Sequence, residues 1–147
     1  MRQLFVAAVV AALVTTSFVS RASAAPPVEV SIDITPSQFC CPELGTWSAS
    51  GAIDDSGAFV RTEIRSNPSI NIFDPQHTGA FQEVFLLTGT HGTLTMRAES
   101  RLTLAEGVLA VWQVASGTGD YERVSGHGSA YFAFPTLFLS GVLSKAD

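Results

Sequence analysis

The stretch SGTGDYERVSGHG, Ser116–Gly128, decides how the rest of the chain is interpreted. Its glycines suggest a loop that cradles phosphate. Such a loop lies between a strand and a helix whose N-terminus receives the anion. Too few residues separate Gly119 from the next glycine to form that helix, and Asp120 and Glu122 would repel an anion. The stretch therefore does not predict phosphate binding.

We interpret the stretch instead as a structural turn between two strands. Gly117 and Gly119 permit a sharp reversal of the chain as it leaves the strand before them. Tyr121 and Val124 are then expected to plug the end of a barrel, and Gly126 to begin the next strand.

The rest of the chain alternates between apolar and polar residues. From Val28 onward the alternation is regular until Pro36, which we expect to end the strand. A period of two with β-branched residues predicts a half-buried strand. The stretches GTLTMRAES (92–100) and RLTL (101–104) repeat this pattern before a hairpin turn at Glu106–Gly107. VLAVWQVAS (108–116) and SAYFAF (129–134) are apolar on both faces, which predicts strands covered on both sides.

Turn residues separate these strands. Asp54–Gly57 predicts another hairpin turn, and Pro135 precedes the last apolar run, TLFLSGVL (136–143). Within Asn67–Gly79 a short helix and an irregular loop are alternatives, and Pro68 and Pro75 favour the loop. Seven or eight strands with closely spaced turns predict an all-β sandwich or a closed barrel.

The turn carries the pattern G-T-G-x-aromatic-x-x-Val-x-Gly over Gly117–Gly126, which resembles the turn that marks the allene oxide cyclase and dirigent barrel superfamily. The similarity extends over about half of the chain, Phe81–Leu143. It implies a closed antiparallel barrel of eight strands with an interior cavity, often assembled into homo-oligomers. Cyclases of this superfamily bind an unsaturated fatty-acid epoxide, and dirigent proteins orient phenoxy radicals. The polar residues that act in either group have no residue-by-residue match in Val28–Ser66, so the resemblance brings no catalytic residue.

The chain begins with the three parts of a secretory signal peptide. Arg2 precedes an apolar run, Leu4–Val14, and the small-residue site Ala22-Ser23-Ala24 follows. The run is shorter than the roughly 20 residues that span a bilayer. We expect a signal-peptide helix over 1–24, a single barrel domain over 25–147, a periplasmic or extracellular location, and no membrane association after cleavage.

The chain is acidic, with a formal charge of −5 at pH 7. Cleavage after residue 24 would leave 6 Lys and Arg against 13 Asp and Glu, a formal charge of −7. Such a surface argues against nucleic acid or anionic lipid as partners.

The two cysteines, Cys40 and Cys41, are adjacent. Consecutive Cα atoms lie about 3.8 Å apart, less than the roughly 4.4 Å at which ordinary disulfides begin. A strained vicinal disulfide, a pair of free thiols and bonds to another chain are the alternatives. The surrounding QFCCPELG offers only Glu43 as a charge, so no positive group activates a thiol.

One acidic residue is a candidate for chemistry. In AFQEVFLL, alternation places four residues on one face: Phe81, Glu83, Phe85 and Leu87. If this face lines the barrel, burial among aromatic rings would raise the pKa of Glu83 and suit it to proton transfer. If Val84 and Leu86 point inward instead, Glu83 is solvated outside. Glu63 likewise either lines the barrel or is solvated outside.

The interior of a small eight-stranded barrel either fills with side chains or holds one small ligand. Core and binding residues can therefore coincide. The candidate ligand-binding set is Phe81, Glu83, Phe85 and Trp112. Four large aromatic residues are more often core than a ligand platform: Trp47, Trp112, Phe132 and Phe134.

The histidines and Ser125 do not predict a metal or hydrolytic site. His77, His91 and His127 lie near glycines or in expected loops, and their spacing has no zinc-ligand pattern. Ser125 and His127 lack the G-x-S-x-G elbow of hydrolases. We predict no metal and no cofactor.

Two functions fit these features. The first is a secreted barrel that binds a small hydrophobic ligand or acts as a non-catalytic interaction domain, including a structural homo-oligomer. The second is a cofactor-free cyclase or isomerase that acts on a lipid- or polyketide-like substrate in the barrel, with Glu83 as the candidate catalytic residue.

Overall fold

The computed structural model describes residues 26–38, 42–66 and 79–146. The expected signal peptide, Cys40, Cys41, His77 and residues 67–78, where a short helix or a loop is expected, lie outside the described residues. Over the described ranges, no helix is long and apolar enough to cross a membrane.

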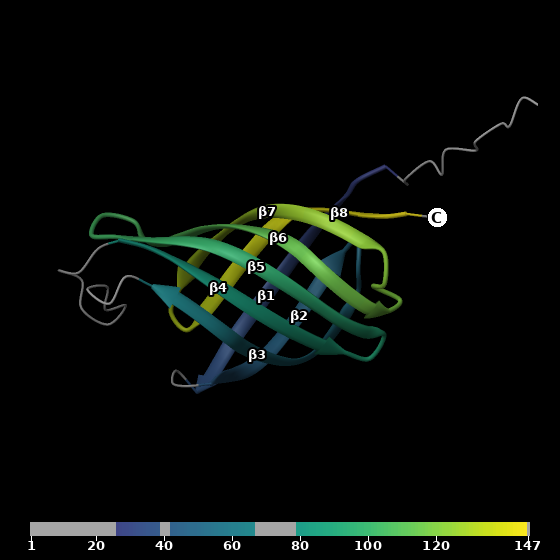
Figure 1. Cartoon of the computed structure of the whole chain (residues 1–147), viewed down its shortest axis with the longest axis horizontal. Helices are drawn as coiled ribbons and strands as arrows, with labels where there is room; N and C mark the ends of the chain where they lie inside the picture. Colours follow the sequence, from purple (N-terminus) through teal and green to yellow (C-terminus); the bar gives the residue numbers. More distant parts are fainter. Residues whose placement is uncertain (1–25, 39–41, 67–78, 147) are drawn as a thin grey trace, which may run out of the picture.

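The described residues form eight strands that close into an antiparallel barrel in sequence order (Figure 1). This confirms the predicted all-β fold and the eight-stranded closed barrel. The strands are β1 (Val28–Gln38), β2 (Glu43–Gly51), β3 (Asp55–Ser66), β4 (Gly79–Gly89), β5 (Gly92–Thr103), β6 (Gly107–Gly119), β7 (Val124–Ala133) and β8 (Thr136–Lys145).

Pairing between β1 and β8 closes the sheet. It runs in register from Val28 opposite Leu143 to Ile34 opposite Leu137. Because successive side chains of a strand point to opposite faces, a closed ladder sends every second residue into the interior. The alternate residues of β1 from Val30 to Ile34 are accordingly buried, as their pattern predicts.

All eight strands contribute to one continuous core. Removal of this apolar surface from water is the main source of stability for the barrel. The largest side chains with less than 2% exposure are Phe59, Phe85, Ile32, Ile34, Leu87, Leu94, Met96 and Leu139.

Two predicted boundaries in the first three strands are wrong. β1 does not end at Pro36 but continues to Gln38. An irregularity in its pairing with β2 falls between these two residues, and such irregularities tolerate a proline that lacks an N–H. The turn predicted at Asp54–Gly57 lies earlier, over residues 52–54, so that Asp55 already belongs to β3. The predicted turn at Glu106–Gly107 is confirmed.

Several apolar side chains on the outer faces of β6 and β7 are uncovered by other described elements. Leu109, Val111 and Tyr131 are 39%, 58% and 53% exposed. Tyr131 stacks on Phe138 of β8, with ring centroids 5.2 Å apart. The expectation that these strands are covered on both sides is therefore wrong over the described residues, because a single barrel buries only its inner face.

The glycine stretch is the turn between β6 and β7, as predicted. Gly119 has a φ of 62°, in the region that favours glycine. A Cβ at Gly117 would overlap the backbone carbonyl of Tyr121, so glycine permits this close approach within the turn. Tyr121 is buried and Val124 packs against the core. β7 begins at Val124 rather than at the predicted Gly126.

Asp55 is a buried carboxylate that ties this end of the barrel together. Its Oδ2 accepts a hydrogen bond from the Tyr121 hydroxyl at 2.6 Å. Its Oδ1 accepts from the Thr90 hydroxyl at 2.7 Å and from the backbone N–H of Thr90 at 3.0 Å and of Ser56 at 2.8 Å. Burial favours the neutral acid, but these bonds outweigh it and hold the pKa of Asp55 well below its usual value. Burial and the adjacent carboxylate raise the pKa of Tyr121.

We predict that Tyr121→Phe lowers the free energy of unfolding at pH 7 by about 1–3 kcal/mol, because a buried acceptor loses its donor. Ionised Asp55 stabilises the fold above its ordinary pKa of 3.8, and this contribution is lost as the pH falls below that value. The difference in the free energy of unfolding between wild type and Tyr121→Phe should therefore shrink below pH 3.8. Urea unfolding at several pH values measures it.

Tyr131→Phe is the matched control, because its ring lies on the outer face. It should change the free energy of unfolding by less than about 0.5 kcal/mol. Equal effects of the two substitutions would contradict the role assigned to the bond between Tyr121 and Asp55.

Candidate functional site

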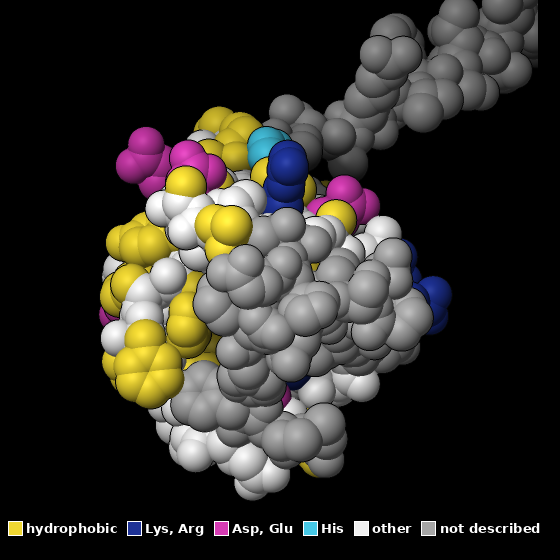
Figure 2. Space-filling model, turned by 90° about the vertical axis from the view of Figure 1, so that its left-hand side faces the viewer, with side chains coloured by type: hydrophobic (Ala, Val, Ile, Leu, Met, Phe, Trp, Pro, Cys, Tyr) yellow, Lys and Arg dark blue, Asp and Glu magenta, His cyan; other side chains and the backbone are white. Residues whose placement is uncertain are grey.

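A cavity of about 280 Å³ lies at the end of the barrel opposite Tyr121. It is bordered by residues late in β1 and β7, in the middle of β3, and early in β2, β4, β6 and β8. Figure 2 looks onto this end, where hydrophobic side chains gather at one edge. Its lining residues are Ile34, Pro36, Glu43, Phe59, Arg61, Phe81, Glu83, Phe85, Val108, Phe132, Phe134 and Leu137.

Strand register brings three charged side chains into this apolar cavity. Glu43 of β2 lies directly opposite Arg61 of β3, and Arg61 lies opposite Phe85 of β4. Directly opposed residues share a face of the sheet. Because Phe85 points inward, Arg61 and Glu43 point inward as well. Glu83 lies two residues before Phe85 in β4 and therefore also points inward.

Arg61 joins the two glutamates. Its Nη1 donates to Glu83 Oε1 at 2.6 Å, and its Nη2 donates to Glu43 Oε2. The Ser100 hydroxyl donates to the second oxygen of Glu83 at 3.0 Å. The Arg61 Nε–H is buried and finds no acceptor among the described residues. The side chains of Glu43, Arg61 and Glu83 are 8%, 12% and 5% exposed, so water screens their charges weakly.

Burial dominates the protonation of Glu83. It raises the pKa of Glu83 above the ordinary value of 4.5, although Arg61 and the Ser100 hydroxyl both favour the charged form. A carboxyl group with a raised pKa in a cavity can hold a proton, donate a hydrogen bond or transfer the proton to a bound molecule.

Five phenylalanines surround this cluster: Phe59, Phe81, Phe85, Phe132 and Phe134. Phe59 and Phe85 lie with ring centroids 5.6 Å apart and planes tilted by 59°. Phe132 and Phe134 meet edge to face at 6.3 Å, and Phe134 is 79% exposed, so its ring lies at the rim of the cavity. The cavity thus combines aromatic walls with one polar cluster.

Most of the predicted ligand-binding set meets in this cavity. Phe81, Glu83 and Phe85 all line it and are buried. Glu83 therefore faces the interior of the barrel and not the solvent. Trp112 does not line it. Its ring packs over Gly128, where a Cβ would lie 2.7 Å from it, and its Nε1 donates to the Ser129 carbonyl at 3.0 Å. Trp112 is therefore a core residue, and the interpretation of it as part of the ligand-binding set is not supported by its position.

Sequence reasoning missed Glu43 and the role of Arg61. Arg61 follows the buried Phe59 by two residues, so its inward position could have been inferred from the alternation. Phe132 and Phe134, interpreted as core, line the cavity instead. For Phe134, which is 79% exposed, the core interpretation is wrong. The side chain of Glu63 lies outside the described part of the structure.

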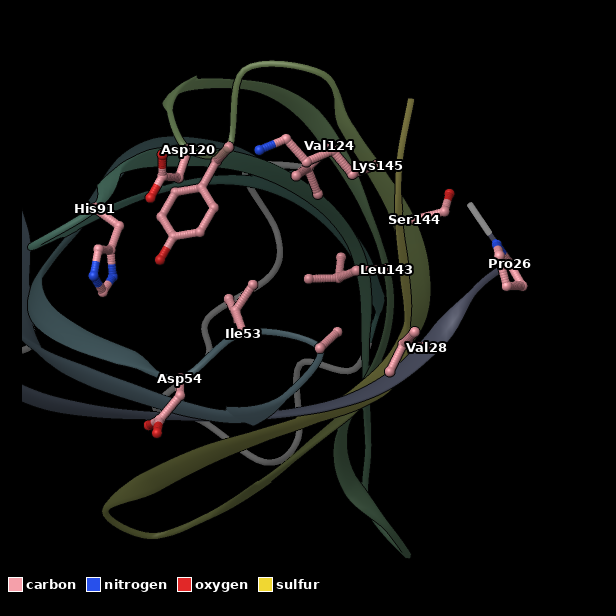
Figure 3. A pocket seen from close by; sticks show the side chains of 12 residues that line it. Pro26, Val28, Ile53, Asp54, His91, Asp120, Val124, Leu143, Ser144 and Lys145 are labelled. Carbon is pink, nitrogen blue, oxygen red and sulfur yellow. The ribbon is translucent and has the colours of Figure 1, made fainter. Parts of the chain in front are cut away.

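A second hollow, of about 540 Å³, lies at the end of the barrel that holds Tyr121 and Asp55, which we call the sealed end (Figure 3). Ile53 and Leu143 point into its middle, and Asp54, Asp120 and His91 stand around its rim. Half of its lining residues are exposed. It is a surface basin above the Tyr121 plug rather than a space inside the barrel.

A third hollow, of about 860 Å³, runs along the outer face of β3 to β7. Exposed polar side chains border it, among them Gln82, Arg97, Glu99, Gln113 and His127. Over the described residues, no three His, Cys, Asp or Glu side chains are grouped as metal ligands. The cavity that holds Glu43, Arg61 and Glu83 is the candidate site because it is enclosed by buried side chains and contains paired charges.

Comparisons with protein-family models, curated proteins and solved structures give no match to this chain. Membership of the allene oxide cyclase and dirigent superfamily therefore stays a prediction.

We predict that Arg61→Gln lowers the free energy of unfolding at pH 7 by about 3–5 kcal/mol, because it leaves two buried carboxylates without their cation. Lowering the pH toward 4.5 should reduce the loss, since protonated glutamates need no cation. Chemical unfolding at both pH values measures the effect.

Arg97→Gln removes the same charge from the exposed outer face of β5. It should change the free energy of unfolding by less than about 0.5 kcal/mol. If both substitutions had the same small effect, Arg61 would not hold the cluster together.

Proposed function

We propose that this protein is a secreted β-barrel that binds one small hydrophobic molecule in the cavity at the end of the barrel opposite Tyr121. The observation that carries this proposal is the cavity itself, whose aromatic walls enclose one hydrogen-bonded cluster of charges. Apolar walls with a few convergent polar groups are typical of small-molecule sites. Export is supported by the sequence of the first 24 residues.

The cavity suits a molecule of one or two rings. Its volume of about 280 Å³ lies at the lower end of the range for ligand sites, roughly 300–1,000 Å³. An apolar cavity of roughly 150 Å³ holds a benzene molecule. A long acyl chain would therefore have to extend past Phe134 at the rim.

The polar cluster would orient the ligand. Apolar walls supply affinity without direction, whereas hydrogen-bonding groups fix one end of a molecule. Glu83 and Arg61 lie on neighbouring strands with their charged groups in contact, so a polar end group of the ligand would be directed toward them.

We predict that 2-naphthalenemethanol, a neutral two-ring probe, binds to one site per barrel and that Val108→Trp weakens this binding at least tenfold. Val108 is half-buried and lines the cavity, so a larger side chain there occupies the space of the probe. Titration calorimetry gives the dissociation constants, and native mass spectrometry gives the stoichiometry.

Leu109→Trp is the control, because Leu109 is the next residue of β6 and points outward. It should leave the dissociation constant within about twofold of wild type. Equal loss in both variants would place the probe elsewhere, and no binding to wild type would refute the proposal.

A second function is favoured by the environment of Glu83. A buried carboxyl with a raised pKa beside aromatic rings is suited to general acid catalysis. On this alternative the barrel is a cofactor-free cyclase or isomerase, in which Glu83 protonates an oxygen of a lipid- or polyketide-like substrate and the substrate rearranges.

We predict, for this alternative, that wild type converts members of a panel of unsaturated epoxides and aromatic polyketones and that Glu83→Gln lowers turnover by about 10²–10⁴-fold. Gln keeps the shape of the side chain but has no proton to transfer. Mass spectrometry and chiral chromatography of the products measure turnover.

Glu99→Gln, on the exposed face of β5, should retain wild-type turnover. Retained turnover in Glu83→Gln would exclude the catalytic role. If wild type converts nothing while still binding the neutral probe, the protein is a binding protein.

A further inference from the structure

We infer that the cavity selects a small aromatic or apolar amine, bound as its cation, over a neutral molecule of the same shape and over a carboxylate. This inference rests on the proposed binding function and names the class of ligand. It is carried by the charges of Glu43, Arg61 and Glu83 and by the aromatic walls around them.

The charges that line the cavity do not cancel. Among the described lining residues, Glu43 and Glu83 contribute two negative charges and Arg61 contributes one positive charge. Ionised, the cluster carries a net charge of −1. The interior of a barrel screens this charge weakly, so a cation that enters gains more attraction than it would at the surface.

Arg61 is already paired with two carboxylates. Its Nη1 and Nη2 each donate one N–H, to Glu83 and to Glu43, and its buried Nε–H has no acceptor among the described residues. A ligand carboxylate that used the remaining N–H groups of Arg61 would lie beside both glutamates. It would also bring a third negative charge into the same cavity, which is strongly unfavourable at short range.

The cavity walls add a second attraction for a cation. An ammonium group is attracted to the face of an aromatic ring when it lies within about 6 Å of the ring centre. Phe81 and Phe85 flank Glu83 on the same face of β4, and Phe59 lies 5.6 Å from Phe85 between ring centres. A cation drawn to the glutamates is thus placed among rings.

Protonation of Glu83 should couple to ligand binding. The groups facing Glu83 are Arg61 from β3 and Ser100 from β5, with Glu43 of β2 on the far side of Arg61. Since the pKa of Glu83 is raised, the acid is protonated at low pH and the cluster is then neutral. A bound cation favours the ionised form, so amine affinity should rise as the pH passes upward through this pKa.

The test compares three probes that share one ring system: 2-naphthylmethylamine, 2-naphthalenemethanol and 2-naphthoic acid. At pH 7.5 wild type should bind the amine about tenfold more tightly than the alcohol, and the acid at least about tenfold more weakly than the alcohol. The ratio of amine to alcohol affinity should fall as the pH is lowered below 7.5. Titration calorimetry measures all three probes.

The outcomes separate the two proposals. Binding of the alcohol with no preference for the amine overturns the inference and leaves the binding function standing. Tightest binding of the acid overturns it as well. If none of the three probes binds, the proposed binding function fails and the inference fails with it.

Glu43→Gln tests the source of the preference. It removes one negative charge and keeps an oxygen that can accept from Arg61, so the ratio of amine to alcohol affinity should fall about tenfold. Glu99→Gln removes the same charge from the outer face and should keep the wild-type ratio. An unchanged ratio in Glu43→Gln overturns the inference. If that variant does not fold, the probe series and its pH dependence in wild type decide.

Discussion

Everything in this barrel depends on the hydrogen bonding of β1 to β8, because that pairing turns an open sheet into a closed one. A closed ladder leaves no free edge strand and fixes which half of the side chains lies inside. A slip of one residue in any pair would turn a strand inside out, so the register of the apolar residues and the closure of the sheet stabilise each other. Ile32 opposite Leu139 is one such buried pair at the seam.

The two ends of the closed barrel bury carboxylates in opposite ways. At the sealed end, Asp55 accepts hydrogen bonds from a tyrosine, a threonine and backbone N–H groups, which favour its charged form. At the end opposite Tyr121, Glu83 has an arginine and a serine, but burial among phenylalanines outweighs them and favours its neutral form. Number and type of donors thus decide whether a buried acid is a fixed structural anion or a group that can gain and lose a proton.

The fold could be predicted from the sequence largely because alternation is a local property. Residues 28–35 and 92–100 show it clearly, and the glycine turn before Tyr121 indicated where the barrel is plugged. The inward face of β4 could not be chosen, since Val84 and Leu86 on the other face are apolar as well. Apolar residues such as Leu109 led to the wrong prediction that β6 is covered on both sides. Composition does not reveal whether a second layer covers the outer face.

Only part of the candidate site could be predicted from the sequence. Phe81, Glu83 and Phe85 are close together in the chain, and their shared face is evident from their spacing. The partners of Glu83 come from other strands: Arg61 is 22 residues away, and Glu43 is a further 18 residues from Arg61. Such contacts depend on strand register, including the irregularity in β3–β4 pairing just after Arg61, which alternation within one strand does not indicate.

The charged cluster is hard to explain as a device for stability. Replacing buried ion pairs by apolar side chains of similar volume is often neutral or stabilising, and the rest of this interior is filled with such side chains. Arg61 even leaves one buried N–H without an acceptor among the described residues, which costs free energy. The cluster also lies beside a cavity, where larger apolar residues could have completed the packing. Space and unbalanced charge among aromatic walls are what a site for a small charged molecule requires. At the sealed end the buried charge of Asp55 is satisfied instead by hydrogen bonds from neutral donors.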